Sequence, residues 1–231
     1  MFDIEYKGVT GRQNGVLITD RPAIPAPVED VELIQVAGRD GALVRDRYLN
    51  PVEFTIPFNF RERPNKWAER MRKIRTWLQG SGELILSDDR EYYRKVLSVQ
   101  VSGEERELKR IGRFEATFNL DPYSYRIDGK EEYAITDRRI LNNEYETSHP
   151  IWILTGSGSQ TLTVNGNTVT VTVQGTTLID TDRMITYTLA DMALRNTRLS
   201  GDYEDLYLVP GVNTVSASGS GTKVIPNWRT R

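Results

Sequence analysis

The clearest alternation of hydrophobic and polar residues along this chain lies between 52 and 60. Every even-numbered position there is apolar, whereas the odd-numbered positions are Glu53, Thr55, Pro57 and Asn59. A period of two is the pattern of a strand in a sheet that is buried on one face. Because Pro57 has no N–H group to donate, we expect this strand to lie at a sheet edge or to be bulged at that residue.

A helical pattern follows this strand, from about Pro64 to Gln79. Proline suits the first turn of a helix, and Gly80 suits its end. The apolar residues that recur at helical spacing are Trp67, Met71, Ile74 and Leu78. The other faces carry one acid, Glu69, among Lys66, Arg70, Arg72, Lys73 and Arg75. This basic surface is either a solvated face or a docking face for an acidic partner.

The rest of the first half has the pattern of short strands joined by turns. Strands are expected at 31–36, 82–86, 92–101 and 110–120. The stretch Gly38–Gly41 forms a turn whose two glycines can adopt positive φ. The chain up to residue 120 therefore forms one unit of strands with a single helix.

The last third of the chain is richer in Thr, Val, Gly and Asn. Strands at 158–164 and 168–173 flank Asn165-Gly166, which is a strong hairpin signal. Further strands are expected at 177–179, 184–188, 206–208, 212–217 and 223–228, with glycine-rich turns at 156–158 and 219–221. Short strands at close spacing predict an antiparallel sandwich. The fold class is therefore mainly β.

A weakly patterned segment separates the two halves. Between Asp121 and His149 the alternation weakens, and charged residues cluster at 128–132 and 137–139. We predict a first domain at 1–122, an arm or linker at 123–148 and a second domain at 149–231. Residues 123–135 are long enough to reach a neighbouring subunit as an arm, and the alternative is a solvated linker.

Composition narrows the class of protein. The 231 residues include no cysteine and carry a net charge of -2. Without cysteine there are no disulfides and no thiolate metal sites, and a near-neutral charge gives no general attraction to nucleic acid. The first residues lack the basic start and apolar stretch of a signal peptide, and no apolar run approaches the ~20 residues that span a bilayer. We expect a protein that is made in a cytoplasm and does not insert into membranes.

Few residues could carry chemistry. The single histidine, His149, has no Gly-x-Ser-x-Gly elbow to accompany it. The carboxylate pairs Asp88/Asp89 and Asp180/Asp182 lie in expected turns, where aspartate caps backbone amides. A calcium site at the second pair would need more oxygen ligands than the loop supplies. We therefore predict no enzyme, with no catalytic, metal-binding or cofactor-binding residue.

Several motifs together resemble the distal tail protein (Dit) family of long-tailed, non-contractile phages. In the first half these are the run 36–43 around Gly-Arg-Asp-Gly, the phenylalanine-rich strand, the helix end and strand at 77–86, and 92–96. In the second half they are 150–152, the Asn-Gly hairpin, 178–181 and 208–213. The resemblance covers most of the chain.

The resemblance implies a split β-barrel with one helix, joined to a galectin-like β-sandwich. It implies six copies in a ring at the virion tail tip, assembled in the host cytoplasm. Such a ring joins the tail tube protein to the tail-associated or tail fibre protein, and some relatives also carry a receptor-binding protein. Neither a reaction nor a cofactor is implied.

Two sets of residues follow from these hypotheses. Subunit contacts are expected at Arg39, Asp40, Lys66, Arg70, Lys73, Tyr123 and Tyr125. The alternative function is a carbohydrate-binding module for host-wall saccharides, in which Trp152 and Trp228 would stack on sugar rings; the competing explanation for these aromatic residues is core packing. A glycoside hydrolase, the third hypothesis, would use Asp180 and Asp182.

Overall fold

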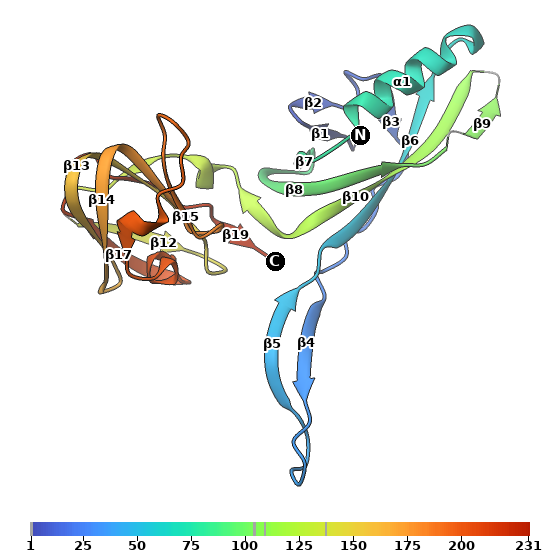
Figure 1. Cartoon of the computed structure of the whole chain (residues 1–231). Helices are drawn as coiled ribbons and strands as arrows, with labels where there is room; N and C mark the ends of the chain where they lie inside the picture. Colours follow the sequence, from blue (N-terminus) through green and yellow to red (C-terminus); the bar gives the residue numbers. More distant parts are fainter. Residues whose placement is uncertain (1, 104, 109, 137) are drawn as a thin grey trace. The chain divides into compact units, whose positions relative to one another are not determined.

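The computed structural model of the chain describes residues 2–103, 105–108, 110–136 and 138–231. The chain divides into two compact units (Figure 1). The first comprises residues 1–124 together with Arg231, and the second comprises Tyr125–Thr230. Within the described residues, no helix is long and apolar enough to cross a membrane.

The first unit is a curled antiparallel sheet with one α-helix (Figure 1). Its elements are β1 (Ile4–Tyr6), β2 (Val9–Thr10), β3 (Val16–Ile18), β4 (Glu29–Ile34), β5 (Leu43–Leu49), β6 (Val52–Arg61), η1 (Pro64–Lys66), α1 (Trp67–Trp77), β7 (Gly82–Leu86), β8 (Asp89–Val101), β9 (Glu105–Leu108) and β10 (Ile111–Arg126). The strand order is β2-β1-β7-β8-β10-β6-β3, with β9 also paired to β10. β4 and β5 form a separate two-stranded sheet.

The core of the first unit lies between this sheet and α1. All five apolar residues of β6 are buried, as the alternation predicts. The apolar stripe of α1 packs against them, with the Trp67 ring 4.8 Å from that of Phe60. Trp77 is also buried, and its Nε1 donates a hydrogen bond to the carbonyl of Tyr6 (3.1 Å). The expected helix is confirmed, with its first turn as the 3-10 segment η1 and Gly80 at φ +72° beyond its end.

Pro57 occupies a local sheet edge, as its missing N–H group predicts. β3 pairs with β6 only at Phe58–Phe60, whereas β10 pairs with β6 along its whole length. Among the residues that the structure describes, β6 therefore has a ladder on one side alone up to Pro57. The chain between β3 and β4 contains three prolines at 22, 25 and 27, which limits the hydrogen bonds it could donate to this edge.

The second unit is an antiparallel sheet structure with short 3-10 turns. Its elements are η2 (Asp128–Lys130), β11 (Tyr133–Ala134), β12 (Arg139–Asn143), β13 (Ile151–Val164), β14 (Asn167–Asp180), β15 (Ile185–Thr188), η3 (Asn196–Arg198), β16 (Leu199–Ser200), η4 (Tyr203–Leu206), β17 (Gly211–Ala217), β18 (Lys223–Ile225) and β19 (Arg229–Thr230). The main order is β11-β18-β13-β14-β15, and β17 links β12 to β13.

The hairpin of β13 and β14 dominates the second unit. The two strands pair from Val164 and Asn167 back to Ile151 and Asp180, joined by Asn165 (φ +52°) and Gly166 (φ +94°). Two residues of positive φ in succession form the type I′ turn that an Asn-Gly pair favours.

Two local predictions in this unit are wrong. The glycine-rich stretch 156–158 is not a turn but lies inside β13, where Gly156 pairs with Gly175. Glycine fits there because a Cβ atom at Gly156 would lie 2.9 Å from the Gln160 side chain. The expected strand at 206–208 is instead the end of η4, followed by a single bridge between Leu208 and Ser148.

The segment expected as an arm or linker, 123–148, packs mostly into the second unit. From Tyr125 onward it belongs to that unit, β12 pairs with β17, and Ile135 and Leu141 lie in the core. Its apolar residues are widely spaced between charges, so the pattern of apolar and polar residues does not predict that this segment packs into the second unit. Asp137, in the charged cluster, lies outside the described residues. At the level of fold class, the mainly β prediction with one α-helix is confirmed.

Candidate assembly surface

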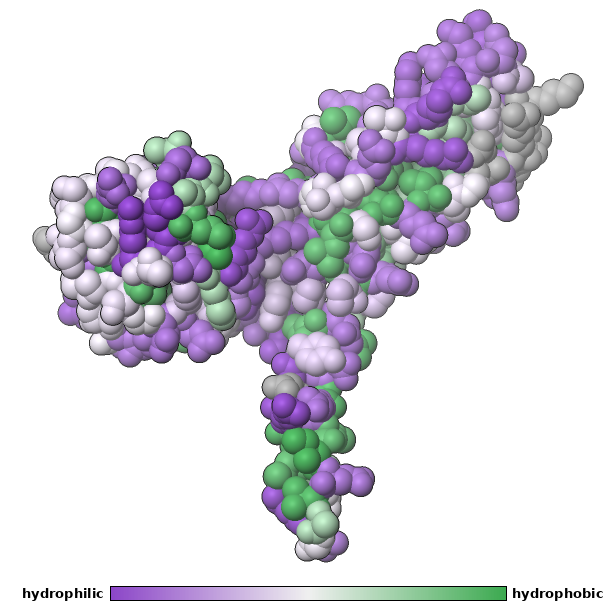
Figure 2. All heavy atoms as spheres, in the orientation of Figure 1, coloured by the Kyte–Doolittle hydropathy of each residue, from purple (hydrophilic) through white to green (hydrophobic). Residues whose placement is uncertain are grey.

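The hairpin of β4 and β5 carries the largest group of exposed apolar side chains. Its strands pair with each other in register from Glu29 opposite Leu49 to Ile34 opposite Leu43, with a bulge near Leu33. Its exposed large apolar residues are Val28, Leu33, Ile34, Val36, Leu43, Val44 and Tyr48. Figure 2 shows hydrophobic residues as green atoms along the part of the molecule where Figure 1 draws β4 and β5. A lone two-stranded hairpin is only marginally stable in water, so this element is suited to being covered by a partner.

The expected contact residues do not include the apolar part of this hairpin. The signal was present at 31–36, where apolar residues occupy both odd and even positions near the end. Such a strand has no polar face. Of the expected contact residues, Arg39 and Asp40 lie in the exposed turn at the hairpin tip, between Gly38 (φ +79°) and Gly41 (φ +82°).

The basic surface of α1 is partly neutralised within the first unit. Arg70 lies 3.4 Å from Glu62 and donates to the carbonyl of Asn14 (3.2 Å), so it ties the helix to its own unit. Lys73 donates to Glu69 (2.9 Å), and this hydrogen bond is the largest cause of a lowered Glu69 pKa. Lys66 is exposed. Lys66 and Lys73 therefore remain accessible for a contact, whereas Arg70 is held by its own unit.

Tyr123 and Tyr125, the other expected contact residues, both lie on β10. Tyr123 is half-buried and Tyr125 is buried. The structure therefore brings together Arg39 with Asp40, and Lys66 with Arg70 and Lys73, but on separate elements.

Trp152 and Trp228 are core residues, which argues against the alternative hypothesis of a sugar-stacking platform. Trp152 is fully buried, and its Nε1 donates to the carbonyl of Leu206 (3.2 Å). Trp228 is 7% exposed and belongs to the same core. A ring that stacks on a sugar must present its face to solvent, so neither tryptophan can serve this purpose in the folded chain.

In the second carboxylate pair Asp180 caps a turn, whereas in the first pair Asp88 forms an ion pair and Asp89 begins β8. Asp88, in the turn between β7 and β8, pairs with Arg21 (2.8 Å). Asp180 accepts hydrogen bonds from the backbone N–H groups of Asp182 and Arg183, both at 3.1 Å. Among the described residues, no group of three or more metal-ligating side chains is close enough to hold a metal ion.

His149 is held by neighbours on both ring nitrogens. Its Nδ1 lies 2.9 Å from Asp182, and its Nε2 lies 3.0 Å from Nη2 of Arg229. Because arginine can only donate, Nε2 is the acceptor and Nδ1 carries the proton given to Asp182. The ring also stacks on Tyr207 at 4.1 Å, and burial raises the pKa of that tyrosine. These contacts tie the start of β13 to the C-terminal strand.

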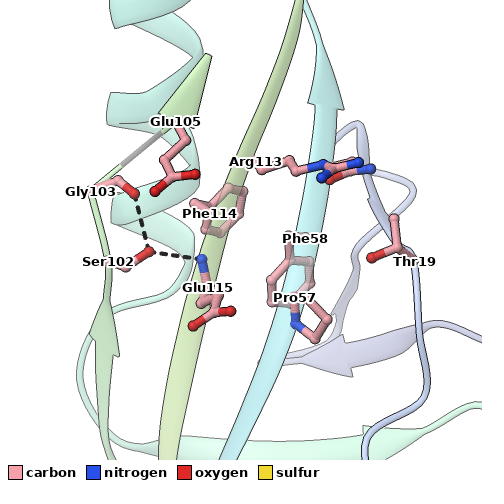
Figure 3. Close-up of a pocket in the computed structure, with 10 residues that line it drawn as sticks. Thr19, Pro57, Phe58, Ser102, Gly103, Glu105, Arg113, Phe114 and Glu115 are labelled. Atoms are coloured by element: carbon pink, nitrogen blue, oxygen red, sulfur yellow. Dashed lines mark hydrogen bonds between the residues drawn. The ribbon is translucent and has the colours of Figure 1, made fainter. Parts of the chain in front are cut away.

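An open hollow of about 780 Å³ lies over β6, β10 and the end of β8 (Figure 3). Arg113, Glu105 and Glu115 line it. The hydroxyl of Ser102 accepts from the backbone N–H of Glu115 (2.8 Å) and donates to the carbonyl of Gly103 (3.1 Å). This serine is thus held in the backbone structure of the loop.

Comparisons with known proteins match the chain to phage tail proteins. Residues 10–120 match the phage tail protein RIFT-related domain family. No curated protein matches the chain. Among solved structures, the Dit protein (gp 19.1) of phage SPP1 is matched with a TM-score of 0.68 at 15% identity, over 97% of each chain. The activated baseplate of phage P2 with calcium gives a TM-score of 0.57 at 11% identity, over 100% of this chain and 97% of that one.

The family match and the structural match cover different lengths of the chain. The family match lies within the first unit and includes the hairpin and α1. The match to SPP1 Dit extends over both units and establishes the shared fold. Residues 10–120 therefore match the phage tail protein RIFT-related domain family, and the chain as a whole has a Dit-like fold.

Proposed function

We propose that this chain is a structural hub protein of a phage tail tip. Six copies form a ring that joins the tail tube protein to the tail-associated tip protein and the host-adsorption apparatus. The observation that carries the proposal is a Dit-like fold in which the hairpin of β4 and β5 is left uncovered by its own chain.

The hairpin supports a ring because of how identical subunits associate. A projecting element that fits a different surface on the next copy gives a head-to-tail contact, and such contacts close into rings when the rotation allows. SPP1 Dit is itself described as a hub adsorption apparatus of phages that infect Gram-positive bacteria. The same role accounts for the present chain without any reaction.

The second unit supports an outward, partner-binding role. It has its own core, and it exposes apolar side chains at Met184, Leu189, Met192 and Leu194. A receptor-binding protein is the partner that we assign to this unit. The saccharide-binding alternative is not favoured, because Trp152 and Trp228 are buried.

Co-purification with the neighbouring tail proteins tests the proposed function. The tagged chain is co-expressed with the tail tube protein and the tail-associated protein of the same phage, and both should be retained. The matched control replaces residues 33–44 by an Asn-Gly turn, which shortens the hairpin without touching either core. Failure of the full-length chain to retain either protein would contradict the proposal.

A further inference from the structure

The distal half of the β4–β5 hairpin, residues 33–44, is apolar on both faces. Residues directly opposite each other in an antiparallel ladder share a face, and successive residues alternate between faces. Leu33 is opposite Val44, and Ile34 is opposite Leu43, so one apolar pair lies on each face. The exposed fractions are 60% and 45% for the first pair and 39% and 40% for the second. Neither face is covered by the rest of the chain.

The proximal half of the hairpin is different, because its charges are solvated or paired. Asp30 accepts a hydrogen bond from the Tyr48 hydroxyl (3.1 Å), and Glu32 lies 3.4 Å from Arg45. A hairpin that lies flat on one partner needs a single apolar face, with polar residues on the other. Two apolar faces in the distal half require cover on both sides.

We propose that residues 33–44 are buried on both faces, in a groove of a second copy of this chain. This inference rests on the proposed ring and specifies how its subunits meet. A groove removes both apolar pairs from water, whereas a flat surface leaves one of them exposed.

Charge complementarity identifies the second copy as the occupant. Residues 29–49 of the hairpin carry five acidic and three basic residues, whereas residues 64–77 carry five basic side chains and one acid. Lys66 and Arg72 of that second segment are exposed. A chain with a net acidic hairpin and a basic helix can associate head to tail with its own copies, guided by these opposite charges.

Labelling each face separately tests whether both are buried. Because the chain has no cysteine, Leu33→Cys and Ile34→Cys can each be labelled at one site with a polarity-sensitive dye. When the protein is concentrated until it assembles, the emission of both dyes should shift to the blue. A dye at Val212→Cys, 68% exposed in the second unit, is the control and should not shift. A shift at only one hairpin position would overturn the proposal that both faces are buried in a groove, but it would not contradict the ring.

Association measurements provide the second readout. Leu33→Arg and Ile34→Arg should each weaken subunit association in sedimentation experiments by at least about tenfold, with circular dichroism confirming that the variants fold. Leu189→Arg, at a site 53% exposed in the second unit, is the matched control and should associate normally. If the parent chain associates and neither hairpin variant weakens this association, the proposed burial of the hairpin in a groove is overturned.

The outcomes also separate this inference from the proposed function. Dye shifts that occur only after the tail tube protein is added would identify that protein as the partner that covers the hairpin. This result would overturn the proposal that a second copy of the chain covers it. A parent chain that associates neither with itself nor with the tail proteins would contradict the hub itself.

Discussion

Substituting Gly112 of β10 by alanine should destabilise the first unit. A Cβ atom there would lie 2.5 Å from the Phe60 ring and 2.6 Å from the Trp67 ring, well inside the ~3.5–4.0 Å of a favourable carbon–carbon contact. Neither ring has free space, since each is 2% exposed. One ring must therefore leave its position, or α1 must move away from the sheet.

The magnitude follows from the cost of overpacking a core. Inserting a methyl group into a filled interior costs roughly 1–3 kcal/mol. Here the added atom would meet two aromatic rings that are themselves in contact, at 4.8 Å between centroids, so we expect a value near the middle of that range. About 2 kcal/mol corresponds to a fall in Tm of roughly 8 °C for a unit of this size.

Differential scanning calorimetry of the full chain measures this effect. The matched control is Gly103→Ala, because nothing lies within 4 Å of a Cβ atom at that position. The control should unfold like the parent chain, whereas Gly112→Ala should lower one transition only. If Gly112→Ala were as stable as the control, the packing of α1 against β10 would be refuted.

Three further changes test other contacts. Gly129→Ala should destabilise the second unit, because a Cβ atom there would lie 2.7 Å from the backbone nitrogen of Trp228; hydrogen exchange should quicken in that unit alone, and equal quickening in both units would contradict this. Trp152→Ala should cost roughly 3–5 kcal/mol in chemical denaturation, since the ring is fully buried; a cost near zero would point to a surface role. Lys73→Met should raise the Glu69 pKa in an NMR titration, because the Lys73 hydrogen bond is the largest cause of its lowering. The lowered pKa means that this stabilisation is present above the pKa of the unfolded chain and is lost as pH falls through the folded pKa; a Glu69 pKa that Lys73→Met leaves unchanged would contradict this origin.

Local patterns in the sequence predict the elements that local forces determine. The alternation at 52–60 predicts β6, and Pro57 predicts its local edge. The Asn165-Gly166 pair predicts the turn between β13 and β14, because only residues that tolerate positive φ fit there. These features depend on neighbours close in sequence, so a single chain contains the information.

Features that depend on distant parts of the chain could not be predicted in the same way. Burial of Trp152 depends on η4, some fifty residues later, which accepts its hydrogen bond. Residues 125–148 join the second unit through partners such as β17, which lie far along the sequence. At the candidate surface, the turn at Arg39 and Asp40 can be predicted from the sequence, but only the strand register shows that Leu33 is opposite Val44 and that Ile34 is opposite Leu43.

Native mass spectrometry of the purified chain, with and without the hairpin residues 33–44, tests whether the hairpin holds a ring of six subunits together. We expect a species of six times the 26.4 kDa chain mass for the full-length protein, and a monomer for the shortened variant. A full-length protein that stays monomeric, both alone and with the tail tube protein, would contradict the ring, and a shortened variant that still forms it would contradict the role of the hairpin.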